Sequence, residues 1–307
     1  MDASKNFDLT TTRAAFIDEA VSRKALFIEQ PYELYSRDNQ EAWKKLWQRL
    51  KPLWEGYASN KFLEGLERLA LNQDAIPHLR EVNKILGPLT GFKARPVSGY
   101  VPGYIFFDSL KERIFPTTIT IRDSQTLDYL PEPDIFHDVA GHVPMHTDSV
   151  FAQVLVKFGS LASQAKERFS SVRDPEIRIA KIKSVMLALS RCFWFTIEFG
   201  LIRQENGLKA YGSGLLSSAG EIVHSIESSE VQRFPLQLEW VINQGFEIDH
   251  YQPLLFVIES FEHLYEELER LECWLHVGKL DHVAPGEPAI DDESLQAFLD
   301  TGGAGDG

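Results

Sequence analysis

The sequence predicts a mainly α-helical fold with a few short β-strands, organised as one large domain. Apolar residues recur at helical spacing along most of the 307 residues, and β-branched runs are few and short. No repeat and no Gly/Ser- or Pro-rich linker divides the middle of the chain. We therefore expect a loosely packed or partly disordered segment at 1–30, the folded domain at 31–280 and a polar tail at 281–307.

Helical periodicity first appears at Asn39, after which large apolar side chains recur every three or four residues: Trp43, Leu46, Trp47, Leu50 and Leu53. Similar patterns predict further helices at 62–71, 76–86, 149–169, 176–199 and 253–274. Gly87-Pro88 is expected to stop the helix at 76–86, because proline lacks the amide hydrogen that a helix needs.

Three segments do not follow helical spacing. RPVSGYVPGYIFFD is rich in Gly and Pro and predicts an aromatic loop that leads into a short helix. TTITI, at 117–121, is β-branched throughout and predicts a strand. LIRQENGLKAYG predicts a hairpin with Asn206-Gly207 as its turn.

The charge balance excludes several kinds of partner. The net charge is −14, from 31 basic and 45 acidic residues, which argues against nucleic acid and against anionic membrane surfaces. No apolar run approaches the roughly 18–20 residues of a membrane span, and the N-terminus lacks a signal-peptide pattern. Cys192 and Cys273 lie in helix-like surroundings, so we expect no disulfide framework and a cytoplasmic location.

The residues that suggest chemistry lie in PEPDIFHDVAGHVP, at 131–144. His137 and His142 are five residues apart, a spacing that an α-helix rotates by about 140°, unlike the i, i+4 pair of zinc proteases. A helix that ends at Gly141 would let His142 turn back toward a metal. Two imidazoles and one carboxylate form the facial triad of non-haem iron(II) oxygenases. Glu198, set among apolar residues in FWFTIEFG, is the candidate carboxylate, because a buried Glu needs a partner.

The same residues also allow plainer interpretations. A histidine pair at this spacing is more often structural than metal-binding, and Glu198 could instead pair with an arginine such as Arg122 or Arg203. His146 could support the site without binding a metal. A zinc hydrolase using the two histidines would need a general-base carboxylate, for which Asp138 is the candidate.

Several motifs resemble those of the pterin-dependent aromatic amino acid hydroxylases. PEPDIFHDVAGHVP resembles the iron-site motif of this family, and TGFKARPVSG, FWFTIEFGLI and AYGSGLLSSAGE match in the same order, so that the resemblance spans about 40–270. Within this family, the chain resembles the short bacterial phenylalanine 4-hydroxylases. The resemblance implies a single catalytic iron and pterin domain with the iron site in a central cleft.

The resemblance implies a role for each matching position. His137, His142 and Glu198 correspond to the iron ligands, and Arg122 to the arginine that binds the substrate carboxylate. The other positions implied to contact substrate are Tyr129, Pro133, Trp194, Phe199, Ser213 and Ser217. The positions implied to contact the pterin are Gly99, Val101, Phe106 and Asp138, the last of which replaces a more usual Glu. Without the resemblance, the aromatic residues among these would be interpreted as core.

The cofactors implied are iron(II) and a tetrahydropterin, with dioxygen as cosubstrate. The same resemblance implies the substrate: Trp194 matches the phenylalanine enzymes better than the tryptophan enzymes, and the apolar Ile248 stands where tyrosine hydroxylases have an acidic residue. L-Phenylalanine, converted to tyrosine, is therefore expected first, tryptophan second and tyrosine third. The sequence leaves open a tryptophan hydroxylase, a meta-directing phenylalanine hydroxylase and a non-catalytic sensor of pterin or amino acid. We expect the partners to be small molecules and the protein to be a monomer or weak dimer.

Overall fold

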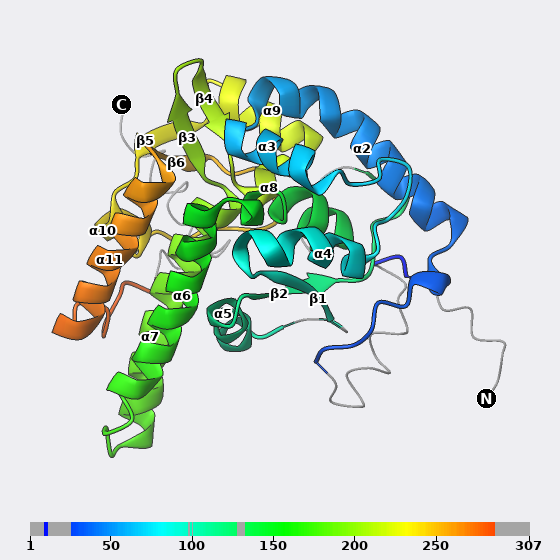
Figure 1. Ribbon diagram of the computed structural model, residues 1–307. Helices are drawn as coiled ribbons and strands as arrows, with labels where there is room; N and C mark the ends of the chain where they lie inside the picture. The colour runs from blue at the N-terminus through cyan, green and yellow to red at the C-terminus, as the bar shows by residue number, and fades with distance from the viewer. Residues whose placement is uncertain (1–8, 12–25, 98, 100, 128–132, 286–307) are drawn as a thin grey trace, which may run out of the picture.

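The computed structural model describes residues 9–11, 26–97, 99, 101–127 and 133–285. These form a mainly helical domain with two small sheets, which confirms the predicted fold class (Figure 1). Most of the segments expected at 1–30 and 281–307 lies outside the described residues, and so does Tyr129.

The N-terminal half begins with three helices, α2 (Arg37–Tyr57), α3 (Asn60–Leu69) and α4 (Leu79–Thr90). A short 3₁₀ turn, η1 (Tyr32–Leu34), precedes them. The aromatic face of α2 is buried, as its periodicity predicts. The expected stop at Gly87-Pro88 is wrong, because α4 continues for one more turn to Gly91, whose φ of +80° suits glycine.

The first sheet pairs β1 (Lys93–Val97) with β2 (Ile114–Thr118) in parallel, and α5 (Gly103–Lys111) connects the two strands. The strand expected at 117–121 therefore begins and ends three residues earlier. Pairing with β1 sets this register, because Ile114 lies opposite Lys93 and Thr118 opposite Val97. The short helix expected at the end of RPVSGYVPGYIFFD is confirmed by α5, but the first three residues of the expected loop belong to β1.

Three long helices lie side by side on one flank of the molecule (Figure 1): α6 (Ser149–Arg168), α7 (Pro175–Phe193) and α11 (Phe261–Val277). Each has a polar N-cap whose side chain accepts backbone N–H hydrogen bonds: Asp148, Asp174 and Ser260 respectively. The long helix expected at 253–274 is wrong in its first part, because the apolar run 254–258 forms a central strand.

The second sheet has the order β4-β3-β6-β5. Its strands are β3 (Leu201–Gln204), β4 (Gly207–Ala210), β5 (Gln232–Pro235) and β6 (Leu254–Ile258). The predicted hairpin is confirmed as β3–β4, although its turn residues are Glu205 and Asn206, since Gln204 pairs with Gly207. The short helices α8 (Ser213–Leu216), α9 (Ala219–Glu227) and α10 (Leu238–Val241) connect the strands.

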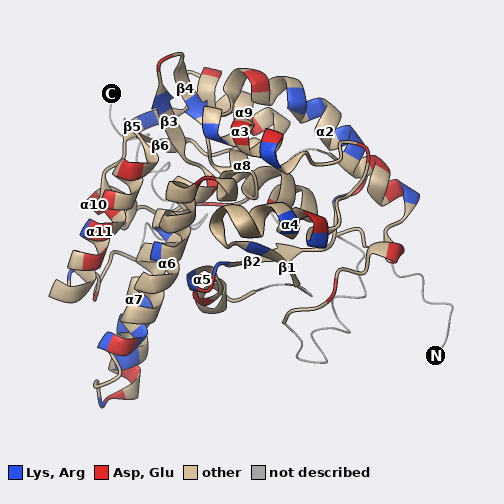
Figure 2. Cartoon of the chain, viewed as in Figure 1, with Lys and Arg blue, Asp and Glu red and all other residues tan. Residues whose placement is uncertain are grey.

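Charged residues of both signs are interspersed along outer helices such as α2, α7 and α11 (Figure 2). The segments around α8, at the centre of the view, carry few charges. Among the described residues, no helix combines the length and apolarity that a bilayer crossing requires.

Gly65 lets α3 approach the turn that follows His142. A Cβ at Gly65 would lie 2.0 Å from the carbonyl oxygen of Pro144, which is backbone and cannot move aside cheaply. Gly56, in the last turn of α2, has no atom within 4 Å of its Cβ position and is exposed. The two helical glycines therefore form a matched pair for testing this contact.

We expect Gly65→Ala to lower the free energy of unfolding by about 2–3 kcal/mol, because the overlap outweighs the higher helix propensity of alanine. Gly56→Ala should be neutral or raise it by up to about 1 kcal/mol. Urea unfolding midpoints of both variants measure the difference. Equal midpoints for the two variants would show that α3 does not rest on Pro144.

Candidate iron site

The histidine pair lies on a π-helical turn, η2 (His137–His142), in which the wider turn joins each N–H to the carbonyl five residues back. The amide of Val143, for example, donates to the carbonyl of Asp138 at 3.3 Å. This hydrogen bonding brings residues five apart onto one face, as α-helical bonding does for residues four apart. The expected helix end at Gly141 is therefore wrong: the turn widens instead, and His142 lies inside it.

Glu198 ends a second π-helical turn, η4 (Trp194–Glu198), which continues α7. The amide of Phe199 donates to the carbonyl of Trp194 at 2.9 Å. The α-helix expected to reach 199 therefore stops at Phe193 and loosens over the residues that carry Trp194 and Glu198.

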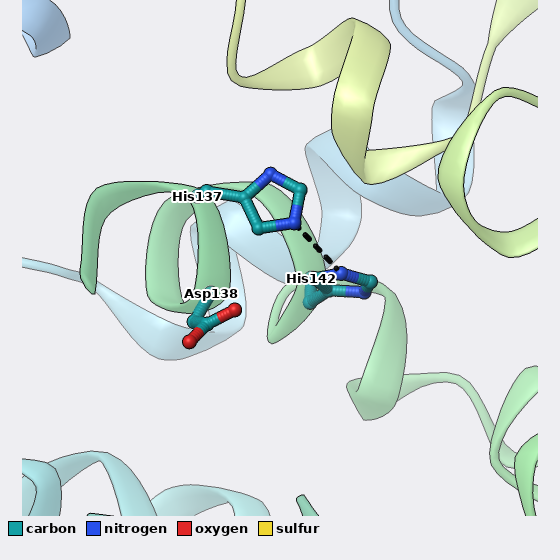
Figure 3. Close-up of side chains that lie close together, drawn as sticks. All are labelled: His137, Asp138 and His142. Atoms are coloured by element: carbon teal, nitrogen blue, oxygen red, sulfur yellow. Dashed lines mark hydrogen bonds between the residues drawn. The ribbon is translucent and has the colours of Figure 1, made fainter. Parts of the chain in front are cut away.

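These two turns place three potential metal-binding side chains next to one another. His137 Nε2 lies 3.2 Å from His142 Nε2 (Figure 3), and Glu198 Oε1 lies 3.2 Å from His142 Nε2. Glu198 Oε2 lies 3.4 Å from His137 Nε2. Atoms on one face of an octahedron with bonds of about 2.1 Å are about 3 Å apart, so this set fits a transition-metal ion such as iron.

The electrostatics of the cluster also suit a cation. Burial alone would raise the pKa of Glu198, but the two imidazoles hold it well below its ordinary value, so the carboxylate is ionised. The side chains of His137 and Glu198 keep 15% and 17% of their surface exposed, whereas His142 keeps 3%. The cluster therefore opens to solvent on the side of His137 and Glu198. Arg122 and Arg203, the other partners considered for Glu198, contact Asp134 and Glu259 respectively.

Two serines of the α8 region contact the cluster. Ser217 Oγ lies 2.8 Å from His137 Nδ1, and Ser213 Oγ lies 2.9 Å from Glu198 Oε2 and 2.7 Å from His142 Nε2. Glycines allow this approach: a Cβ at Gly212 would meet the Glu198 carbonyl oxygen at 2.4 Å. The structure thus places both serines beside the potential metal ligands.

Arg122 is buried and forms a two-point pair with Asp134. Its Nε donates to Asp134 Oδ2 at 2.7 Å, and Nη2 donates to Oδ1 at 3.1 Å. Asp134 also accepts from the backbone amide of His137 at 2.9 Å. Burial alone would raise the pKa of Asp134, but Arg122 and the backbone amides lower it. Asp134 was missed in the sequence, although its position three residues before His137 has the spacing of an Asp that caps a helix.

Asp138 is the second carboxylate near the histidines. One ligand atom each from His137, Asp138 and His142 lies within 4.8 Å of the others, and Figure 3 shows the three side chains. Asp138 Oδ2 accepts from the backbone amide of Thr118 at 2.6 Å, which ties it to the end of β2. Burial raises the pKa of Asp138, against the opposing effect of the histidines.

An aromatic wall adjoins Glu198. The ring of Trp194 stacks on Phe246, with centroids 4.3 Å apart, and lies 4.5 Å from Phe199. Its indole N–H donates to Gln252 Oε1 at 3.0 Å. Phe246 and Gln252 were missed in the sequence because they belong to an irregular segment with no spacing signal. Pro133, also expected in the pocket, is exposed next to Asp134.

Of the residues expected to contact pterin, Phe106 is separated from His142 by the ring of Phe115. The half-buried Phe106 packs edge-on against Phe115, with ring centroids 5.9 Å apart, and Phe115 lies 4.8 Å from the His142 ring. Gly99 and Val101 precede α5, the helix that carries Phe106, and are half-buried.

Comparisons with known proteins agree with this arrangement. The family profile described as "Biopterin-dependent aromatic amino acid hydroxylase" matches residues 9–276. Phenylalanine-4-hydroxylase of Chromobacterium violaceum is 35% identical over 272 residues, covering 88% of this chain and 86% of that protein. Tyrosine 3-monooxygenase of Rattus norvegicus is 38% identical over 243 residues, covering 78% of this chain and 45% of that protein.

A solved structure of C. violaceum phenylalanine hydroxylase bound to cobalt matches with a TM-score of 0.76 and 34% identity, covering 87% of this chain and 91% of that one. The matches define an iron- and pterin-dependent monooxygenase that acts on aromatic amino acids. The chain belongs to the biopterin-dependent aromatic amino acid hydroxylase family.

Glu221 is a buried carboxyl group that contacts Gln252, the hydrogen-bond partner of Trp194. It is 1% exposed, its Oε1 accepts from the backbone amide of Gln252 at 3.1 Å, and its Oε2 has no hydrogen-bond partner. Burial raises the pKa of Glu221 to about 8. The folded protein therefore keeps this proton up to about pH 8, whereas the unfolded chain loses it near the ordinary value of 4.5.

Stability should consequently fall as the pH rises from about 4.5 to about 8, because the folded state holds the extra proton in that window. Glu221→Gln keeps the acceptor and carries no charge, so it should gain stability relative to the unchanged protein as the pH rises, by up to about 1.4 kcal/mol per pH unit within this window. Urea unfolding of both proteins at several pH values between 5 and 8 measures this difference in stability. Glu230→Gln, at an exposed position, is the control. A difference that does not change with pH would disprove a buried, protonated Glu221.

Proposed function

We propose that this protein is an iron(II)- and tetrahydropterin-dependent monooxygenase that hydroxylates the ring of L-phenylalanine to form tyrosine, using dioxygen. The convergence of His137, His142 and Glu198, with potential ligand atoms 3.2–3.4 Å apart, carries the proposal. These three residues would hold the iron, and their arrangement on one side leaves adjacent positions open. Bound iron(II) and tetrahydropterin together supply the activation of dioxygen and two electrons.

Glu198 is preferred over Asp138 as the carboxylate ligand. Both oxygens of Glu198 face imidazole Nε2 atoms, whereas Asp138 has one oxygen engaged by the amide of Thr118. A zinc hydrolase would need Asp138 as a general base, and this short backbone hydrogen bond leaves that oxygen poorly suited to accept a proton. Asp138 instead fits a role on the pterin side, at the end of β2.

The protein's own groups would bind and orient the amino acid. Arg122 would bind the substrate carboxylate, while Asp134 holds one edge of the guanidinium and so fixes its direction. Trp194, Phe199 and Pro133 would enclose the ring, which needs apolar surroundings. Phe106, with Gly99 and Val101, would hold the pterin. Ser217, bonded to His137 Nδ1, would fix the orientation of that imidazole.

Phenylalanine is the substrate that the wall favours. Trp194, Phe199 and Phe246 present apolar faces, and Ile248, 49% exposed on the following loop, offers no partner for a phenolic hydroxyl. Several bacterial relatives bear the name phenylalanine-4-hydroxylase, including that of Caulobacter vibrioides, which is 34% identical over 284 residues. Tryptophan hydroxylation and meta-directed hydroxylation of phenylalanine are the alternative outcomes of the same test.

We expect iron(II)-loaded protein with a tetrahydropterin to consume dioxygen and convert phenylalanine to tyrosine, faster than it converts tryptophan or tyrosine. His142→Ala should lose at least about a thousandfold in rate, because it removes a ligand from the metal. Oxygen-electrode traces and mass spectrometry of the products measure both. Product from tryptophan, or meta-tyrosine, would correct the substrate or the ring position. Iron-loaded protein that hydroxylates no aromatic amino acid would refute the proposal and favour a sensor.

Arg122→Lys should raise the KM for phenylalanine about tenfold or more and change the KM for the pterin by less than about twofold. Lysine keeps the positive charge but loses the planar fork that binds a carboxylate at two points. Steady-state kinetics with each substrate varied in turn measure the two constants. Equal increases in both constants would indicate that Arg122 maintains the fold of the site and does not bind the amino acid.

A further inference from the structure

The hydroxyl of Ser213 contacts two of the potential metal-ligand side chains, His142 and Glu198. Its Oγ lies 2.7 Å from His142 Nε2 and 2.9 Å from Glu198 Oε2. The residue is 1% exposed and occupies the first position of α8, immediately after Gly212. Resemblance to the family placed Ser213 among residues that contact substrate, but the structure turns its hydroxyl toward the carboxylate.

A serine hydroxyl has one hydrogen, so Ser213 cannot donate it to both His142 Nε2 and Glu198 Oε2. An imidazole that binds iron through Nε2 offers its lone pair to the metal and cannot accept this hydrogen. The remaining contact of Ser213 Oγ, with the carbonyl oxygen of Ile197, is longer at 3.4 Å. A carboxylate that binds a metal carries no proton and only accepts hydrogen bonds, and so the hydroxyl hydrogen is assigned to Glu198 Oε2 at 2.9 Å.

The backbone fixes this hydroxyl in place. Gly212 and Gly214 pack against Glu198, since a Cβ on either would lie within 3.0 Å of the Glu198 carbonyl oxygen. Gly141 of η2 packs against Ser213, because a Cβ on Gly141 would lie only 3.1 Å from the Ser213 carbonyl oxygen. Ser213 is thus held between the two turns that carry the proposed ligands.

We propose that Ser213 is a positioning residue for the metal site: its hydroxyl holds Glu198 Oε2 by a hydrogen bond, so that Glu198 binds the metal through Oε1 alone. A carboxylate that binds through one oxygen occupies one coordination position, whereas binding through both occupies two. Holding Oε2 therefore preserves an open position for dioxygen or substrate. The inference rests on the proposed ligand set of His137, His142 and Glu198.

The test uses cobalt(II) as the probe metal, because its visible absorption weakens as the coordination number rises. Metal-free protein is titrated with cobalt(II) for the unchanged chain, Ser213→Ala, Ser213→Thr and His142→Ala. Ser213→Ala should bind cobalt(II) roughly tenfold to a hundredfold more weakly, the range found when a partner of a metal ligand is lost. Its visible absorption should also weaken, because Glu198 can then bind through both oxygens. Ser213→Thr keeps the hydroxyl and should restore both properties.

Thermal unfolding of the metal-free variants shows whether each one is folded. The inference is wrong if Ser213→Ala keeps the affinity and spectrum of the unchanged protein. It is also wrong if Ser213→Thr changes both as much as Ser213→Ala, because the size of the side chain would then matter and not its hydroxyl. If His142→Ala binds cobalt(II) as tightly as the unchanged protein, the proposed ligand set itself fails, and the role of Ser213 fails with it.

Discussion

The i to i+5 hydrogen bonding of η2 and η4 is the constraint on which the rest of the site depends. It turns a histidine spacing that an α-helix would spread over two faces into a pair whose Nε2 atoms lie 3.2 Å apart. A π-helical turn is rare and persists where the surrounding structure fixes it. Here the fixing elements are α3, which meets Pro144 through Gly65, and α8, which meets Glu198 through Gly212. The geometry of the ligands is therefore a property of the packed domain and not of either helix alone.

One buried carboxylate couples the two ends of the site. Asp134, fully buried, accepts hydrogen bonds from the guanidinium of Arg122 and from the backbone amide of His137. In a low-dielectric interior such charge-assisted hydrogen bonds are strong and directional. The group proposed to bind the substrate carboxylate and the segment proposed to bind the metal consequently share one anchor, which sets the distance between them. A ring held by Trp194 then has a defined position relative to both.

Much of this arrangement could be predicted from the sequence, and the failures have physical causes. Helical periodicity predicted the long helices, because one buried stripe per helix repeats in the sequence. It could not separate the strand at 254–258 from the helix that follows, since LLFVI is apolar in either structure. His137, His142 and Glu198 were found from residue type and from family resemblance. The π-helical turns were missed because tertiary packing, and no local pattern, specifies them. Asp134, Gln252 and Phe246 act through contacts made only after folding.

The indole of Trp194 is bonded to Gln252, whose amide in turn donates to the carbonyl of Glu247 on an exposed loop. The aromatic wall proposed to enclose the substrate ring is therefore linked to surface residues that contribute little to the core, and the exposed Ile248 lies in the same segment. Exposed positions tolerate substitution far better than buried ones. Descendants of such a chain can thus acquire a different preference for the aromatic ring by changes at the surface, while the proposed metal ligands and their buried supports stay the same. Selection for a new substrate and selection for a stable fold then act on largely separate residues.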